Sequence, residues 1–155
     1  MADMFRVLAV TAVIVLAGSC SGPCSGSPPA GAPKQHLVFT GPAPGTLTTA
    51  DVACHLFNDQ SQFNALVTGN LDGQDLVFNI QVYAGYKGPG TYQVGSTLDG
   101  SGNLRLQVGT WVGSSTTGAG TLIIGPDAKS GVVDANLGDG EHVTGSFTCS
   151  ELKTD

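Results

Sequence analysis

Charged residues are scarce in this sequence, and positive charge is the scarcer sign. Asp, Glu, Lys and Arg make up 12% of the 155 residues, and 12 acidic residues against 6 basic ones leave a formal net charge of −6. The chain has no cluster of basic residues that could neutralise phosphates, which argues against nucleic acid as a partner. The acidic residues stand singly on predicted turns, where we expect them to aid solubility.

Motifs typical of catalysis or cofactor binding are also missing. The sequence has no Gly-x-Ser-x-Gly nucleophile turn, and no close pair of Cys or His in the folded region suits zinc. His142, Asp139 and Ser146 could form a catalytic triad, and Asp134 and Glu141 could form a carboxylate pair. Their spacing in the sequence does not favour either arrangement. We therefore expect no enzyme and no cofactor.

No apolar run in the sequence is long enough to cross a bilayer. Residues 5–16 (FRVLAVTAVIVL) are almost wholly apolar, but about 20 residues are needed to span the hydrocarbon core. A short apolar run that ends in small residues is typical of a secretory signal. Residues 1–19 are therefore predicted to be a signal peptide, with a buried core helix as the alternative.

The residues before Cys20 predict how this signal is processed. Residues 16–19 (LAGS) place small side chains directly before the cysteine, which resembles the lipobox of bacterial lipoproteins. That resemblance implies that Cys20 is linked to diacylglycerol and becomes the mature N-terminus, whereas Cys24 follows a proline and fits less well. Two or three acyl chains on one residue would hold the protein stably on a membrane. The alternative is ordinary signal-peptidase cleavage near Ser19, followed by secretion.

Residues 20–34 (CSGPCSGSPPAGAPK) are rich in Pro, Gly and Ser and lack apolar periodicity. This composition is typical of a tether, intermediate between a flexible coil and a polyproline spacer, with an extended reach of roughly 45 Å. We expect residues 35–155 to form one folded domain that stands off the extracytoplasmic surface of a membrane.

Two of the four cysteines, Cys54 and Cys149, are predicted to form a disulfide. They lie near the start and the end of the folded region, and an oxidising compartment permits the bond. Closing a loop of this length stabilises a fold by roughly 4 to 5 kcal/mol on the chain-entropy model. With Cys20 acylated, Cys24 is left over in the tether, either free or available for an intermolecular bond.

Alternation of apolar and polar residues dominates the folded region. Residues 62–71 and 74–83 alternate on either side of Asp72-Gly73, a strong hairpin signal. Residues 49–57 fit a strand or the start of a helix, and the strands that follow favour a strand. The remaining predicted strands are residues 90–95, 103–112, 119–125, 130–137 and 143–149. About eight short strands between Gly-rich turns predict an all-β fold, an antiparallel β-sandwich or barrel.

Aromatic residues are few, and the three tyrosines lie within ten residues of one another. Tyr83, Tyr86 and Tyr92 are close in sequence, and Trp111 is on a later predicted strand. Planar rings on a β-surface can stack on sugars or anchor a protein partner. These four residues are therefore a possible binding surface, with core packing as the alternative.

One loop has the spacing of a calcium site. Asp99, Ser101 and Asn103 offer oxygen side chains at alternate positions, as a loop that wraps a hard cation does. The loop lacks the downstream bidentate Glu of an EF-hand, and the same residues form an ordinary turn. The acidic residues 134–141 give a similarly weak signal, so no metal is predicted.

The lipobox-like signal, the low-complexity tether and a small β-domain ending in residues 143–149 (VTGSFTC) together resemble the small surface lipoproteins of actinobacteria, including mycobacterial lipoprotein antigens. The resemblance implies an envelope-associated, non-enzymatic protein and carries over no active site. Our leading hypothesis is a lipid-anchored binding domain with a protein, glycan or lipid partner. A carrier of a lipid or small apolar molecule between two sheets and a secreted enzyme are the alternatives.

Overall fold

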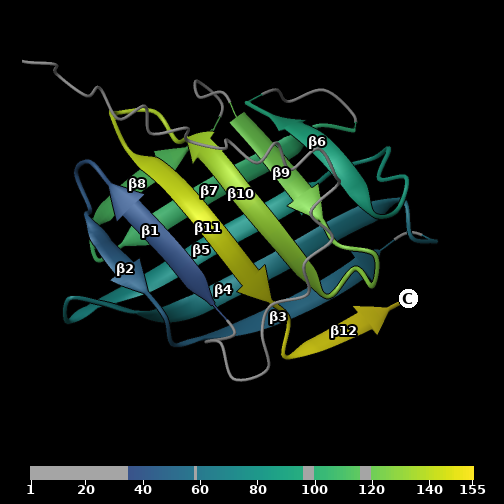
Figure 1. Cartoon of the computed structure of the whole chain (residues 1–155), viewed down its shortest axis with the longest axis horizontal. Coiled ribbons are helices and arrows are strands. Elements are labelled where there is room, and N and C mark those ends of the chain that lie inside the picture. Colours follow the sequence, from purple (N-terminus) through teal and green to yellow (C-terminus); the bar gives the residue numbers. More distant parts are fainter. Residues whose placement is uncertain (1–34, 58, 96–99, 116–119) are drawn as a thin grey trace, which may run out of the picture. The chain divides into compact units, whose positions relative to one another are not determined.

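β-Strands make up all the regular structure in the described part of the chain. The computed structural model describes residues 35–57, 59–95, 100–115 and 120–155. Its strands are β1 (His36–Thr40), β2 (Gly45–Leu47), β3 (Ala50–Phe57), β4 (Gln62–Leu71), β5 (Gln74–Val82), β6 (Gly90–Val94), β7 (Gly102–Val108), β8 (Trp111–Ser114), β9 (Gly120–Ile124), β10 (Ser130–Asn136), β11 (His142–Thr148) and β12 (Glu151–Thr154). The predicted all-β fold is confirmed (Figure 1).

Alternation of side chains explains how the long strands pack. In β5, Leu76, Phe78 and Ile80 are buried, whereas Val77 is exposed and Gln81 half-buried. The same alternation in β3 confirms the strand prediction for residues 49–57. Because successive side chains point to opposite faces of a strand, one face of each long strand enters the interior and the other faces outward.

The strands form one mixed sheet, in the order β12-β3-β4-β5-β7-β6-β9-β10-β11-β1-β2, with β8 paired to β7. The β4–β5 hairpin turns at Asp72-Gly73 as predicted. Both turn residues have the positive φ of a tight hairpin turn, 49° and 84°. β12 lies parallel to β3, and β6 meets β7 through a single parallel pair, whereas the other pairings are antiparallel.

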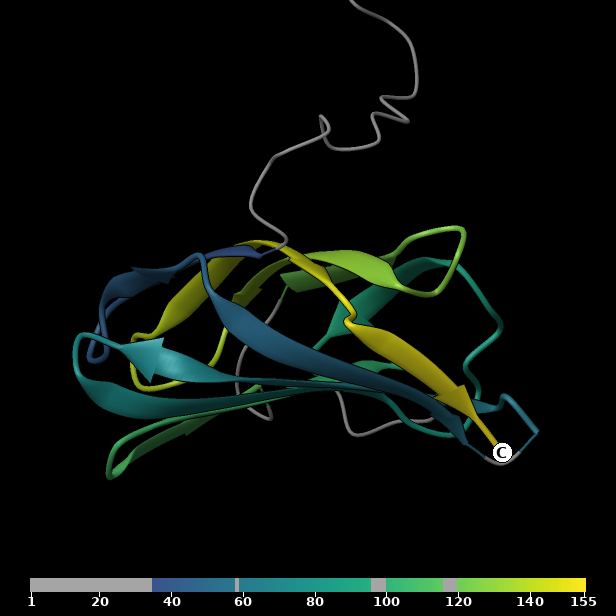
Figure 2. The same cartoon turned by 90° about the horizontal axis from the view of Figure 1, so that it is seen from below.

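The sheet curls so that its two halves face each other as two layers (Figures 1 and 2). Layer A contains β3, β4, β5, β7, β8 and β12, and layer B contains β1, β2, β6, β9, β10 and β11. At one edge, Val94 of β6 pairs with Gly102 of β7. At the other edge, the chain crosses from β11 to β12, and the Ser150 amide donates a hydrogen bond to the Val52 carbonyl.

The predicted disulfide is confirmed. Cys54 on β3 is bonded to Cys149, directly after β11, with their Cα atoms 5.7 Å apart. Both cysteines are buried. The bond joins layer A to layer B across a sequence separation of 95 residues, and so limits how far the layers can separate.

Apolar side chains from both layers fill the space between them. Phe39 of β1 meets Phe78 of β5 edge to face, with ring centroids 6.0 Å apart. Leu104 of layer A and Leu122 of layer B belong to the same continuous cluster and have no exposed surface. This cluster occupies the space in which the carrier alternative would place a ligand.

The structure has several short strands that the sequence pattern did not predict. Residues 103–112, predicted as one strand, lie in two: the chain turns at Gly109-Thr110, and β7 and β8 form a hairpin. Gly109 has a φ of +56°, and a Cβ there would lie 2.3 Å from Oε1 of Gln74. Glycine therefore permits this turn. The other added strands are β1, β2 and β12.

The first described residue is fixed to the domain. Gln35 is 2% exposed, and its Nε2 donates a hydrogen bond of 2.9 Å to the carbonyl of Ala50 at the start of β3. The predicted signal peptide, Cys20, Cys24 and tether lie outside the described residues. In the described ranges, no helix is long and apolar enough to cross a membrane.

Candidate functional site

The four aromatic residues considered as a binding surface do not share one surface. Tyr86 and Tyr92 are 6% and 8% exposed, and their rings stack with centroids 5.7 Å apart. Tyr86 also stacks on Phe63 at 5.6 Å. The surface prediction is wrong for these two tyrosines, because alternation turns Tyr92 of β6 inward and the preceding loop folds Tyr86 onto it.

The buried tyrosines differ in the partners of their hydroxyl groups. The Tyr92 hydroxyl accepts a hydrogen bond from the Lys87 amide and donates one to the Gly88 carbonyl, so it closes the loop before β6. The Tyr86 hydroxyl is buried and has no hydrogen-bond partner among the described residues. Burial, with a smaller effect of the neighbouring Tyr92, raises the pKa of Tyr86 to about 12. Tyr86 is thus a core residue with an unsatisfied polar group.

Trp111 and Tyr83 lie at opposite ends of layer A. Tyr83 directly follows β5, whereas Trp111 pairs with Val108, which pairs with Leu76 near the start of β5. Trp111 lines a hollow of about 180 Å³ together with Pro42, Ala43, Pro44, Leu71, Asp72, Gln74 and Val108. This volume is below the ~300 Å³ at which pockets for drug-sized molecules begin.

Glu141 supports one wall of the Trp111 hollow. Its side chain is fully buried, and Oε2 accepts a hydrogen bond of 2.9 Å from the amide of Ala43. Its Oε1 has no partner among the described residues. Asp134, the other member of the considered carboxylate pair, is exposed on β10 and lies 2.8 Å from His142. The two carboxylates therefore occupy different environments.

The considered triad is not assembled. Nε2 of His142 lies 2.8 Å from Asp134 rather than contacting Asp139. Ser146 is four residues further along β11, which places it about 13 Å away at the rise of an extended strand.

The considered calcium loop is only partly described. Asp99 lies outside the described residues, Ser101 is half-buried, and Asn103 is a β7 residue that pairs with Gln81. Among the residues that the structure describes, no group of three or more His, Cys, Asp or Glu side chains is placed to hold a metal ion.

The outer face of layer A carries a group of amide side chains that the sequence analysis did not single out. The members of this group are all half-buried Asn or Gln residues on β4, β5 and β7, and we call them the amide face: Gln62, Asn64, Asn79, Gln81 and Asn103. Asn64 pairs with Gln81, and Gln81 pairs with Asn103. His55 of β3 pairs with Asn64 from the other side. These four residues form one row across four adjacent strands.

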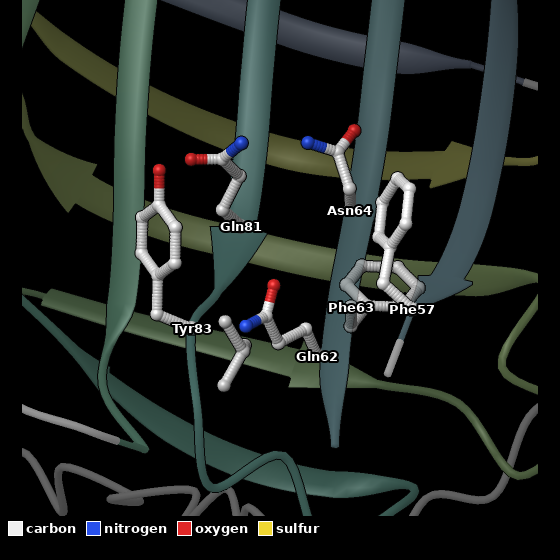
Figure 3. A pocket seen from close by; sticks show the side chains of 7 residues that line it. Phe57, Gln62, Phe63, Asn64, Gln81 and Tyr83 are labelled. Atoms are coloured by element: carbon white, nitrogen blue, oxygen red, sulfur yellow. The ribbon is translucent and has the colours of Figure 1, made fainter. Parts of the chain in front are cut away.

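Two aromatic rings flank the amide face. Tyr83 is 51% exposed, and Phe57, the last residue of β3, pairs with Gln62. Figure 3 shows the amides of Gln62, Asn64 and Gln81 between these two rings, along a shallow hollow of about 30 Å³. The hollow is thus lined by rings at its sides and amides between them.

His55 fixes the position of the Phe57 ring. The two rings lie with centroids 3.7 Å apart, and Nε2 of His55 lies 2.8 Å from Oδ1 of Asp155 near the C-terminal strand. Asp155, which follows β12, thus holds His55, and His55 packs against Phe57. The Phe57 wall of the hollow is therefore supported by two residues that do not line it.

Most of the hydrogen-bonding capacity of the amide face is not used by other side chains or backbone groups of the described residues. Nδ2 of Asn64 donates a hydrogen bond of 3.0 Å to Oδ1 of Asn79. The side-chain amides of Gln62, Gln81 and Asn103 make no hydrogen bond to another described residue. Each amide offers an acceptor oxygen and two N–H donors side by side. The face can therefore bind a ligand that presents donors and acceptors close together.

Comparison of the chain with protein-family models, with curated proteins and with solved structures found no match. Part of the amide face could have been predicted from the sequence. A two-residue turn at Asp72-Gly73 pairs Asn64 with Gln81 across the hairpin, and both are polar residues at outward positions of the alternating pattern.

Proposed function

We propose that this protein is a non-catalytic binding domain, held on the extracytoplasmic side of a bacterial membrane by a lipid on Cys20, with the amide face as its binding surface. The lipobox-like residues 16–19 support the anchor, and the composition of residues 20–34 supports the tether. The disulfide between Cys54 and Cys149 fits an oxidising, extracytoplasmic compartment.

One observation carries this proposal: Gln62 and Gln81, two half-buried amides that make no side-chain hydrogen bond to another described residue, lie with Asn64 between two aromatic rings on one sheet face. A strand gains stability from β-branched or aromatic residues at such positions and loses it from Asn. A partly buried amide without a partner adds a desolvation cost. A cluster of residues that each lower the stability of the fold is expected at a site where they bind a ligand.

The filled interior favours a surface ligand over the carrier alternative. A carried lipid would have to replace buried side chains such as Phe39 and Phe78, which contact each other between the layers. No observation supports the enzyme alternative. His142 contacts Asp134, Glu141 bonds to the Ala43 amide, and Ser146 lies further along β11, so the considered groups do not form one site.

The test compares three forms of the full-length chain, purified in detergent from the membranes of the cells that make them. They are the wild type, an amide-face variant (Gln81→Ala with Tyr83→Ala) and a control variant on layer B (Gln93→Ala with Ile123→Ala). The control likewise removes one Gln and one large exposed side chain, since Gln93 is exposed and Ile123 is 44% exposed. Each form is incubated with cell envelopes that have been extracted free of lipid.

We expect the envelopes to retain the wild type and the layer B variant and to release the amide-face variant. Equal retention of all three forms, or retention of none, would contradict the proposed binding surface. Mass spectrometry of the same wild-type preparation tests the anchor. The expected mass begins at Cys20, includes acyl chains and is lower by two hydrogens for the disulfide, whereas an unmodified chain cut elsewhere would contradict lipidation.

A further inference from the structure

We infer that the ligand of the amide face is a neutral glycan with vicinal hydroxyl groups. This inference rests on the proposed function, because it names the chemistry of the ligand for the same surface. Four observations support it: the donor and acceptor pair on each amide, the spacing of the amides across the strands, the flanking rings and the absence of charge on the amides themselves.

Side-chain amides match pairs of sugar hydroxyls. Gln81 and Asn103 each present an acceptor oxygen next to an N–H donor, and neither group is bonded to another described residue. A hydroxyl donates one hydrogen bond and accepts others. Two hydroxyls on adjacent carbons can therefore bind one amide in a bidentate manner, with one accepting from nitrogen and the other donating to oxygen.

The spacing of the row suits a polymer. Asn64, Gln81 and Asn103 are directly paired on three adjacent strands, and neighbouring strands lie about 4.8 Å apart. That repeat is close to the length of one sugar unit along a polysaccharide. A chain that crosses the strands along this row would place a hydroxyl pair over each amide in turn.

The rings provide surfaces for the apolar faces of sugars. A pyranose ring has C–H groups on its faces and hydroxyls at its edges, so it is bound well by aromatic rings beside polar groups. Tyr83 and Phe57 stand on either side of Gln62, Asn64 and Gln81 (Figure 3). The hollow between them is shallow, about 30 Å³, so it suits a chain lying on the surface better than a small molecule enclosed in a pocket.

The uncharged row favours a neutral ligand over an acidic one, and the cation Arg105 on this face pairs with Asn79 beside the row. Asn64, Gln81 and Asn103 are uncharged, and the His55 ring at the end of the row already contacts the carboxylate of Asp155 at 2.8 Å. The whole chain has a formal net charge of −6, which disfavours a polyanion. A protein partner is less well matched, because the centre of a protein interface is usually apolar, whereas the centre of this surface is made of amides.

The first test treats the delipidated envelopes before binding. One portion is oxidised with periodate and reduced with borohydride, which cleaves vicinal diols and leaves most of the polypeptide intact. A second portion is digested with a broad-specificity protease and washed. We expect retention of the full-length wild type to fall at least tenfold on the oxidised portion and to be unchanged on the digested portion.

The outcomes separate this inference from the proposed function. Retention that survives periodate, or that is lost after protease digestion, would overturn the glycan assignment while the amide face remains a binding surface. No retention on untreated envelopes would overturn the proposed function itself. Loss on the oxidised portion alone would support both.

A pair of substitutions at one residue tests the role of the ring. Tyr83→Phe keeps an aromatic face, whereas Tyr83→Leu keeps apolar area without a planar ring, and both leave the half-buried amides in place. We expect Tyr83→Phe to bind within about twofold of the wild type and Tyr83→Leu to bind roughly three- to tenfold more weakly. Equal affinity of the two variants would contradict stacking of a sugar on Tyr83.

Discussion

On layer B, the outward positions at the centre of the sheet are Ile123 and Val132, which pair across β9 and β10 and are 44% and 46% exposed. On layer A, the outward residues Asn64 and Gln81 of β4 and β5 also pair directly, but they are amides and half-buried, and the next outward pair toward the strand centres is Leu66, 38% exposed, with Asn79. Both layers have buried apolar residues at the alternate positions and share one core.

Each outer face carries bonded polar pairs, such as His55 with Asp155 on layer A, but layer A also carries half-buried amides with no side-chain bond to another described residue. On layer B, the exposed Asp134 and His142 contact each other at 2.8 Å. On layer A, Gln62, Gln81 and Asn103 have no described protein partner. Because a shared core sets the inward residues of both layers, the difference outside is not required by folding. The outer face of layer A is therefore where selection for binding is best sought.

The largest expected effect comes from removing the covalent link between the layers. Cys54→Ala with Cys149→Ala should lower the free energy of unfolding by about 4 kcal/mol, because the closed loop of 95 residues no longer restricts the unfolded chain. Urea unfolding of the full-length chain, followed by Trp111 fluorescence, measures the change. Cys24→Ala, which leaves this disulfide intact, is the control and should unfold as the wild type does. A loss below about 1 kcal/mol would show that packing alone joins the layers.

A smaller effect tests the one tyrosine hydroxyl that is buried without a partner in the shared interior. Well below pH 10 the Tyr86 hydroxyl is neutral in both the folded and the unfolded chain, so its ionisation does not change the free energy of unfolding there. Burial raises the folded-state pKa from 10.0 to about 12, so the unfolded chain loses its proton first, and stability falls as the pH rises through this window. The expected loss by pH 12 is about 2 to 3 kcal/mol.

Tyr86→Phe should lack this part of the alkaline loss, while near pH 7 it should be as stable as the wild type or slightly more stable. The reason is that the hydroxyl is buried without a partner. Tyr83→Phe is the matched control, since Tyr83 is 51% exposed, and it should keep the wild-type pH profile. Identical profiles for all three proteins between pH 9 and pH 12 would count against the assignment.

The smallest effect sharpens the contrast between the outer faces. Gln81→Val should raise the free energy of unfolding more than Gln93→Val does, by about 0.5 kcal/mol. Both substitutions gain β-propensity, but only Gln81 is half-buried, and it lacks a partner, whereas Gln93 is exposed. Thermal unfolding of the two variants gives the difference. An equal gain would mean that the amide face carries no cost to stability.

Much of the fold could be predicted from alternation and turn residues. Asp72-Gly73 fixed one hairpin, and the number of residues on either side of it determined that Asn64 pairs with Gln81. The Cys54–Cys149 disulfide followed from the position of the two cysteines at the ends of the domain. These features are local, or depend on a small number of residues, so one sequence was sufficient.

Other features depended on contacts that no local pattern contains. The pairing of Gln81 with Asn103 joins strands separated by β6 and two loops, and it completes the amide row. Residues 103–112 were predicted as one strand that includes Gly109-Thr110, because residues typical of strands continue past the turn into Trp111 and Val112 of β8. The inward position of Tyr92 is consistent with the alternation of β6, whereas Tyr86 lies in the loop before β6, and loop residues have no periodicity that reveals which way they face.

The hydrogen bond from Gln35 to Ala50 also has a mechanical consequence. It holds the start of the domain against the first residue of β3, while Phe57, seven residues later at the end of the same strand, borders the candidate ligand hollow. At the rise of an extended strand these ends are about 23 Å apart. If a tethered domain holds a fixed polymer, tension enters β1, which directly follows Gln35, and also β3 through the Gln35–Ala50 hydrogen bond; along β3 it runs across the direction of the hydrogen bonds to β4 and β12. These bonds would then be loaded together in shear rather than opened one by one.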